Sequence, residues 1–485
     1  MAEPNTNSKK EVKLGLLGLT ALVVGSIIGS GIFNLTRDMS ASASLMGIVI
    51  SWIIAGLGMT FLVLCFFNLS RKRPDLEAGI YSYAKEGFGK YVGFNSAWGY
   101  WISAWIGNVA YATLAFSALG YFFGIFEGGQ NLASIIGASI ALWLVAFLIS
   151  RGIKQASFMN TIVTIAKLVP ILIFIVIIMA AFKLNIFTSD VWGNAMNNNG
   201  LVWENLIAQI KSTMLITVFV FIGIEGAAVF SGRAKRAKDV GKATILGLMT
   251  VMSIYILVTV LSLGVMTAPE LANLDKPAMA SLLEHVVGKW GSILVNLGVI
   301  ISIAGAWLAW TLFAMELPYR AAKNKAFPAF FAKESKRGVP IGSLLVTTVL
   351  IQLFIFIIFV NNAAYEFAFS LCSSMILIPY ALTAFYQLKY SAKEDKTRSR
   401  VWNIIVGAVA SIYAIWLLYA GGLEFLLIMT LLYAAGIIVY VITQKQVHAK
   451  KLFTSYEWVL ASIFTVVAIY AIYWLATGGY QAIMG

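Results

Sequence analysis

The fold is decided by Gly25-Ser26-Ile27-Ile28-Gly29-Ser30-Gly31-Ile32-Phe33, a stretch in the middle of the first long apolar segment. Glycine in a helix interior costs about 1 kcal/mol relative to alanine, so three glycines this close together predict a break in the helix. Backbone groups freed at membrane depth are tolerated only where they are buried in protein or line a polar cavity. The break therefore predicts a site.

The same device recurs at Gly223-Ile224-Glu225-Gly226, inside a later apolar segment. Two interrupted helices at corresponding places in two halves of a chain indicate the substrate site of a transporter. Glu225 lies deep in the membrane in this reading, where it could bind a cationic substrate or exchange a proton as gates move. The alternative is a structural carboxylate satisfied by neighbouring backbone amides.

Composition makes this chain a polytopic membrane protein. Of its 485 residues, 60% are hydrophobic and only 12% are charged, against about 25% charged residues in a typical soluble protein. Segments of the ~20 apolar residues that cross a bilayer predict an all-α fold with thirteen spans, at 14-36, 44-69, 91-123, 132-150, 157-182, 208-231, 241-266, 288-318, 342-361, 364-388, 401-420, 423-443 and 455-477.

The net charge of +14 reflects membrane topology. With the N-terminus in the cytoplasm, 29 of the 35 Lys and Arg residues fall in the inner loops, as the positive-inside rule requires. Residues 1-13 are then a cytoplasmic tail without a cleavable signal, and thirteen spans place the C-terminus outside. This placement argues against a nucleic-acid-binding surface.

Three further side chains stand out inside the predicted spans. Asn108 must hydrogen-bond another helix or a ligand, since an unpaired amide in apolar surroundings costs several kcal/mol. Lys167 lies far from either face, which favours a proton carrier or an ammonium in place of a metal cation; the alternative is snorkelling to the inner surface. Trp310 either packs in a core or faces a cation, and the residue alone favours packing.

These motifs, taken in order, resemble one known family. The chain is similar to the basic amino acid/polyamine antiporters of the amino acid-polyamine-organocation superfamily at Gly29-Ser30-Gly31, Trp105-Ile106-Gly107-Asn108, Gly223-Ile224-Glu225 and Trp310-Thr311-Leu312. The closest subgroup is the bacterial arginine/ornithine antiporters, which Lys72-Arg73-Pro74-Asp75-Leu76 also resembles. The similarity covers the whole chain, and the ordered set is far more specific than any single Gly-Ser-Gly.

The resemblance implies a LeuT-like fold with broken first and sixth helices. Spans 1-5 (14-182) would form one inverted repeat, spans 6-10 (208-388) the second, and 401-477 the additional C-terminal helices. It also implies a multi-pass protein of a bacterial plasma membrane that could form a homodimer. We expect amino acid and amine substrates, no cofactor, no metal and no enzymatic activity.

The resemblance also assigns roles to residues. The Gly-Ser-Gly turn would present amides to the substrate carboxylate, and the broken sixth helix would present carbonyls to the α-ammonium. By position, Asn108 would hold a guanidinium, Trp310 would stack on the side chain, Glu225 would gate, and Lys167 would occupy the sodium site of sodium-coupled relatives. The full set of expected substrate contacts is Ile28, Gly29, Ser30, Gly31, Asn108, Tyr111, Phe219, Ile222, Gly223, Trp310 and Ser373.

Two positions depart from the family's pattern. Phe219 stands where arginine/agmatine exchangers often carry tryptophan, and Tyr111 stands where a smaller apolar contact is common. Ser373 also has an alternative to substrate binding, because its hydroxyl can form its hydrogen bond within its own helix. The departures bear on side-chain specificity and leave the transport class unchanged.

The implied function is exchange of L-arginine for L-ornithine by alternating access. Histidine/histamine, lysine/cadaverine and agmatine/putrescine exchange stay open, as does proton-coupled amino acid uptake. A hydrolase built on Ser30 and Lys167 would need further acidic or histidine partners and an oxyanion site. A channel would need rings of charges or carbonyls along an open pore, and a sensor would usually carry a soluble signalling domain, so all three classes are disfavoured.

Overall fold

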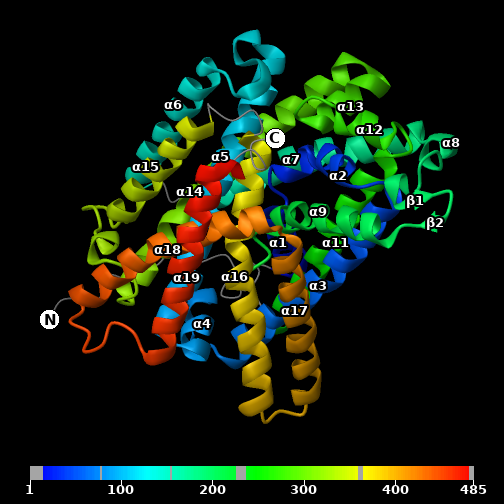
Figure 1. The fold of residues 1–485 in the computed structure, drawn as a ribbon. Coiled ribbons are helices and arrows are strands. Elements are labelled where there is room, and N and C mark those ends of the chain that lie inside the picture. Colours follow the sequence, from blue (N-terminus) through cyan, green and yellow to red (C-terminus); the bar gives the residue numbers. More distant parts are fainter. Residues whose placement is uncertain (1–14, 77–78, 153–155, 226–235, 359–363, 480–485) are drawn as a thin grey trace.

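The structure is a computed structural model that describes residues 15–76, 79–152, 156–225, 236–358 and 364–479. The chain forms a bundle of long helices with short helices at its ends (Figure 1). Its helices are α1 (Leu16–Ile27), α2 (Leu35–Ser42), α3 (Leu45–Lys72), α4 (Ile80–Phe88), α5 (Lys90–Phe122), α6 (Leu132–Ser150), α7 (Ala156–Ala181), α8 (Leu184–Phe187), α9 (Trp203–Phe221), α11 (Ala237–Ser262), α12 (Ala268–Ala272), α13 (Ala278–Val287), α14 (Lys289–Lys323), α15 (Ile341–Ile358), α16 (Ala364–Lys393), α17 (Arg400–Ala420), α18 (Leu423–Gln446) and α19 (Ser455–Trp474).

Sheet is confined, within the described residues, to one two-residue hairpin of β1 (Met196–Asn197) and β2 (Gly200–Leu201). Its strands are antiparallel, with Met196 opposite Leu201. The prediction of an all-α membrane protein is therefore confirmed.

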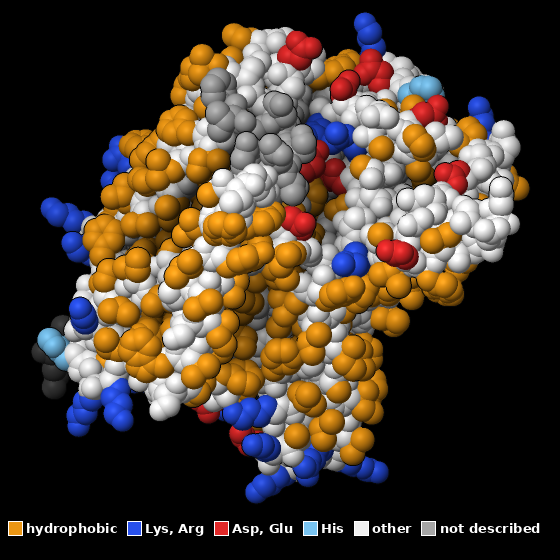
Figure 2. All heavy atoms as spheres, viewed as in Figure 1, with side chains coloured by type: hydrophobic (Ala, Val, Ile, Leu, Met, Phe, Trp, Pro, Cys, Tyr) orange, Lys and Arg blue, Asp and Glu red, His pale blue; other side chains and the backbone are white. Residues whose placement is uncertain are grey.

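Ten helices in the described part of the chain are long and apolar enough to cross a membrane. The three predicted spans not among them, 14-36, 157-182 and 342-361, coincide with α1 and α2, with α7 and with α15. Figure 2 shows hydrophobic side chains across the middle of the visible face and Lys and Arg side chains gathered at its lower end. The count of thirteen spans stays a prediction.

The first predicted break is confirmed. Helix α1 ends at Ile27, and the backbone passes through Ile28 and Gly29 before the 3₁₀ turn η1 (Gly31–Phe33) and α2. Ile28 makes the last helical hydrogen bond, from its amide to the carbonyl of Val24 at 3.0 Å. The backbone beyond it leaves the helix at the glycines, as the sequence predicts.

The second break follows α9, whose last residue gives way to a turn at 222–225; residues 226–235 lie outside the described part. Gly223 has a φ of +103°, and a β-carbon built there would lie 2.6 Å from the carbonyl oxygen of Ser26. Only glycine tolerates both the backbone conformation and this approach. The two breaks are therefore in direct contact.

Helix α5 is the centre of the bundle. Its apolar segment is 89% buried, whereas that of α19 is 17% buried. The helices that pack most extensively against α5 are α14 and α16. One face of α5 borders the space between the two breaks, while α19 lies at the periphery beside α18 (Figure 1).

Between α3 and α5 the chain forms α4, a short helix of 9 residues. One face of α4 is buried by Ile80, Tyr81, Tyr83 and Ala84. The helix packs against α5 and α16. Helix α4 is therefore held against the bundle by this apolar face.

The first turn of α19 forms hydrogen bonds with the residues that join α4 to α5. Glu457, which caps its own helix, also accepts a hydrogen bond of 2.9 Å from the amide of Tyr91 in the first turn of α5. Tyr456 donates its hydroxyl to the carbonyl of Phe88. Gly89 has a φ of +93°, and a β-carbon there would lie 2.4 Å from the Tyr456 hydroxyl. The peripheral helix thus makes specific contacts with a central one.

Candidate functional site

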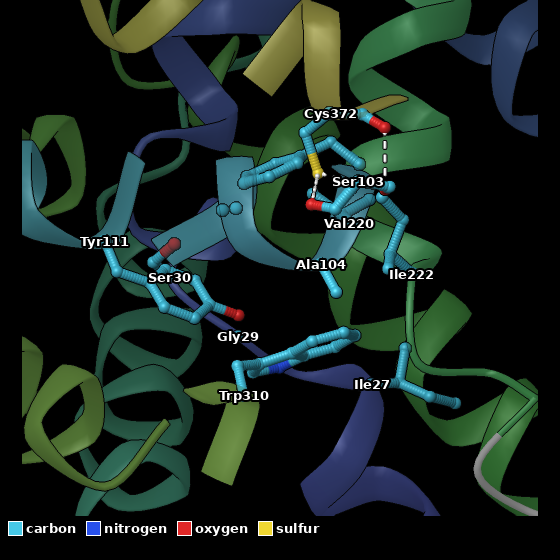
Figure 3. Close-up of a pocket in the computed structure, with 13 residues that line it drawn as sticks. Ile27, Gly29, Ser30, Ser103, Ala104, Tyr111, Val220, Ile222, Trp310 and Cys372 are labelled. Carbon is cyan, nitrogen blue, oxygen red and sulfur yellow. Dashed lines mark hydrogen bonds between the residues drawn. The ribbon is translucent and has the colours of Figure 1, made fainter. Parts of the chain in front are cut away.

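A cavity lies where the two breaks meet α5, α14 and α16 (Figure 3). Its volume is about 20 Å³, enough for about one water molecule and far below the several hundred Å³ of a typical ligand pocket. A substrate the size of an amino acid requires the surrounding helices to move apart. The lining residues are Ile27, Gly29, Ser30, Gly31, Ser103, Ala104, Gly107, Tyr111, Phe219, Val220, Ile222, Trp310 and Cys372.

Seven of the expected substrate contacts belong to this lining: Gly29, Ser30, Gly31, Tyr111, Phe219, Ile222 and Trp310. The other four, Ile28, Asn108, Gly223 and Ser373, are not in this lining, although each is next to a lining residue in the sequence. The sequence reasoning missed Ser103, Gly107 and Cys372, among others. Ser103 and Gly107 are four residues apart and Gly107 is four from Tyr111, so helical spacing from Tyr111 could have identified both.

The first break presents unpaired hydrogen-bond donors to the cavity. Within the described residues, the backbone amides of Gly29, Ser30 and Gly31 have no hydrogen-bond acceptor. The hydroxyl of Ser30 is also without a partner, although the residue is only 1% exposed. Because buried donors are nearly always paired, this turn is built to receive an acceptor.

Lys167 of α7 lies behind the first break. Its ammonium nitrogen donates to the carbonyls of Gly25 at 2.5 Å and Ile28 at 2.6 Å, and the residue is 3% exposed. The ammonium therefore lies inside the bundle and does not snorkel to the surface. A cation bound to the backbone carbonyls of a broken helix stabilises the partial negative charge there.

Tyr255 of α11 connects the two breaks. Its hydroxyl donates to the carbonyl of Val220, at the end of α9, at 2.8 Å, and lies 3.5 Å from the carbonyl of Ile27, at the end of α1. A β-carbon on Gly31 would lie 2.9 Å from the Val220 side chain. The Tyr255 hydrogen bond and the close contacts at Gly31 and Gly223 hold the end of α1 next to the end of α9.

The aromatic side of the cavity comes from α14 and α9. Trp310 is half-buried and makes an edge contact with Phe313, with ring centroids 5.4 Å apart. Phe219 packs against Phe369 at 5.6 Å. In Figure 3 the indole of Trp310 lies flat beneath the cavity, on the side opposite Cys372. The indole therefore offers its face as a wall of the site.

Asn108 is fully buried one turn from the cavity-lining Ala104. Its amide nitrogen donates to the carbonyl of Ala104 at 3.0 Å, and its oxygen lies 3.5 Å from the hydroxyl of Thr311. The amide is thus satisfied by its own helix and by α14. Its expected contact with a guanidinium stays a prediction.

Glu225 is bound by side chains from two other helices. Its carboxylate accepts hydrogen bonds from the hydroxyls of Tyr100 on α5 and Tyr380 on α16, the latter at 2.7 Å, and from the amide of Gly223 at 3.2 Å. The residue is 5% exposed. Only one of these three donors is a backbone amide, and the other two are tyrosine hydroxyls. The carboxylate therefore connects the second break to α5 and α16.

The tenth predicted span contributes a cysteine to the cavity. Ser373 directs its hydroxyl to the carbonyls of Leu215 and Phe369, at 2.8 and 2.7 Å. The neighbouring Cys372 exchanges contacts with Ser103: the serine hydroxyl donates to the Cys372 carbonyl at 2.7 Å, and the thiol to the Ser103 carbonyl at 3.2 Å. These contacts fix α5 against α16 at the cavity.

Polar contacts lie on both sides of the cavity along α16. Glu366 forms ion pairs of 2.6 Å with Arg37 of α2 and 2.8 Å with Lys276. At a rise of about 1.5 Å per residue, Glu366 and Tyr380 lie about 9 and 12 Å to either side of Cys372 along the helix. The ion pairs and the Glu225 cluster therefore lie on opposite sides of Cys372 along α16.

Comparison with known proteins adds independent information. Residues 14–424 match a family model described as amino acid permease. The chain is 48% identical to an arginine/ornithine antiporter of Pseudomonas aeruginosa over 413 residues, 83% of this chain and 85% of that protein. It is 41% identical to an arginine/ornithine antiporter of Latilactobacillus sakei and 40% identical to an arginine/agmatine antiporter of Chlamydia pneumoniae, in each case over 98% of this chain and 99% of the relative.

Proposed function

The chain belongs to the amino acid permease family, and from that premise we propose that it exchanges L-arginine for L-ornithine across the plasma membrane by alternating access. Relatives with either antiporter name span nearly the whole chain, which supports antiport of cationic amino acids. Agmatine as the second substrate is the alternative, because one of these relatives carries that name.

The observation that carries the proposal is the set of unpaired donors at the first break. The amides of Gly29, Ser30 and Gly31 and the Ser30 hydroxyl offer hydrogen bonds to an α-carboxylate. The indole face of Trp310 on the opposite wall suits a cationic side chain, an attraction of roughly 0.5–2 kcal/mol. An amino acid with a cationic side chain satisfies both ends of the site.

The two sets of polar contacts suit the gates of an alternating-access cycle. The proposed repeats, 14-182 and 208-388, would rock against each other around the breaks. Opening one side would separate Glu366 from Arg37 and Lys276, and opening the other would release Glu225 from its tyrosines. Lys167 would keep the first break stable without a bound metal cation.

Several further features belong to this proposal. The N-terminus would lie in the cytoplasm and the C-terminus outside, supported by the 29 of 35 basic residues in alternate loops. Transport, with no chemical step, would be the whole activity. The protein could assemble as a homodimer.

Counterflow in proteoliposomes tests the function directly. Vesicles loaded with ornithine should take up labelled arginine, and empty vesicles should not. Arginine and ornithine each carry one net positive charge at neutral pH, so the uptake rate should not respond to an imposed membrane potential. Asn108→Ala should raise the half-saturation concentration for arginine by about tenfold, equivalent to 1.4 kcal/mol.

Two results would contradict the proposal. Equal uptake into empty and loaded vesicles would show that the protein is not an obligate exchanger. Potential-driven uptake of arginine would show that its counter-substrate carries a different charge or that transport is uniport. Exchange of agmatine as readily as arginine would favour the alternative substrate pair.

A further inference from the structure

The hydroxyl group of Tyr111 lies directly over the first break. Tyr111 belongs to α5, lines the cavity and is 7% exposed. A β-carbon built on Gly29 would lie 2.9 Å from the hydroxyl oxygen and 3.7 Å from the ring carbon Cζ. The hydroxyl is therefore the atom nearest to the position that a side chain at Gly29 would occupy. In Figure 3 the ring extends from α5 toward Gly29, with its oxygen directed at the space above Trp310.

The described groups at the break beside this hydroxyl are hydrogen-bond donors. The Ser30 hydroxyl and the amides of residues 29–31 have no acceptor within the described part of the chain. In the described part of the chain, the residues that line the cavity are all uncharged. A carboxylate accepts at two oxygens with about four lone-pair sites, and hydrogen bonds to an ionised acceptor are stronger than neutral ones. The cluster thus fits an anionic group.

We propose that the Tyr111 hydroxyl donates to the α-carboxylate of the substrate and makes this protein select an amino acid over its decarboxylated amine. The inference rests on the proposed function, because it takes a cationic amino acid as the occupant of the cavity. Agmatine retains the guanidinium of arginine and lacks the carboxylate. With agmatine bound, the Tyr111 hydroxyl and the Ser30 hydroxyl would both stay buried without an acceptor, which is costly.

The test measures arginine and agmatine binding to the purified full-length protein by calorimetry. In Tyr111→Phe the ring stays and the hydroxyl is lost. The Kd for arginine should rise about tenfold, which corresponds to 1.4 kcal/mol, while the Kd for agmatine should change by less than about twofold. Tyr413→Phe is the matched control, because Tyr413 of α17 is buried outside the cavity lining and should leave the ratio of the two constants unchanged.

A double-mutant cycle with Gly29→Ala makes the test independent of one variant. In the wild type, the added methyl group meets the Tyr111 hydroxyl at 2.9 Å and must displace it, so arginine binding should weaken selectively. In Tyr111→Phe the next ring atom is 3.7 Å away, an ordinary contact, and Gly29→Ala should then cost little. The two substitutions should therefore be strongly non-additive.

The possible outcomes separate the inference from the proposed function. Selective loss of arginine binding in Tyr111→Phe, or in Gly29→Ala if the first variant does not fold, supports the inference. Equal weakening of arginine and agmatine overturns it and leaves the transport function intact. A wild-type protein that binds neither compound overturns the proposed function and the inference with it.

Discussion

Replacing Gly223 by alanine should block the conformation in which the two breaks touch. The added β-carbon would lie 2.6 Å from the Ser26 carbonyl oxygen, 0.8 Å closer than the 3.4 Å at which ordinary contact begins. The φ of +103° adds backbone strain for any residue with a β-carbon, about 1–3 kcal/mol. Overpacking a filled interior costs about 1–3 kcal/mol more.

The combined cost of about 2–6 kcal/mol falls on a state that the transport cycle must visit. Since each 1.4 kcal/mol is a factor of ten, the exchange rate of Gly223→Ala should fall by at least about thirtyfold. The assay is arginine/ornithine counterflow, read together with the midpoint of thermal unfolding in detergent. Gly124→Ala is the control, because a β-carbon at Gly124 has no neighbour within 4 Å.

The outcome that refutes this reasoning is specific. If Gly223→Ala exchanges at the wild-type rate and unfolds at the wild-type temperature, the two breaks do not need to approach each other as closely as they do here. A variant that unfolds early but exchanges normally would show that the contact stabilises the protein without limiting the cycle.

Three further predictions concern other contacts. Exchange should persist when choline replaces sodium, and collapse of wild-type uptake in choline would exclude the role of Lys167. Lys167→Ala should slow turnover more than it weakens binding, because two buried carbonyls then lose their hydrogen-bond donor, at a cost of about 1–3 kcal/mol each. Trp310→Leu should weaken arginine more than a neutral analogue of equal length, by roughly 0.5–2 kcal/mol, and equal losses in a competition assay would mean that the indole only packs. Burial acts to raise the pKa of Asp395 in the α16–α17 loop, but hydrogen bonds from the Lys72 ammonium and neighbouring donors hold it well below its usual range. The stabilisation by this pair is therefore lost only when the pH falls below the usual pKa of an aspartate. The contribution of the pair to the thermal unfolding temperature should then be the same at pH 7 and pH 5. Asp395→Asn should lower the unfolding temperature at both values.

The breaks could be predicted because their cause is local. Glycine disfavours a helix wherever it stands, so the glycines around Ser30 and at Gly223 mark interruptions without knowledge of the neighbours. Apolar length likewise predicted the long helices. The turn at the first break and the positive φ of Gly223 follow from the same property.

The partners across helices could not be predicted, because they depend on how distant segments pack. Tyr100 and Tyr380 flank Glu225 from helices far apart in sequence, and nothing distinguishes them from the other 18 of the 20 tyrosines in the chain. Cys372 meets Ser103 across 269 residues. For the same reason the sequence favoured Ser373, one position away, whose hydroxyl faces α9 in the structure.

The contact of α19 with the start of α5 has a consequence for the order of assembly. Synthesis proceeds from the N-terminus, and the acceptor for the Tyr91 amide, Glu457, lies 366 residues further along the chain. Until the ribosome has made α19, the first turn of the central helix α5 lacks this partner. The peripheral helix is therefore made long after the central one and completes the beginning of the core.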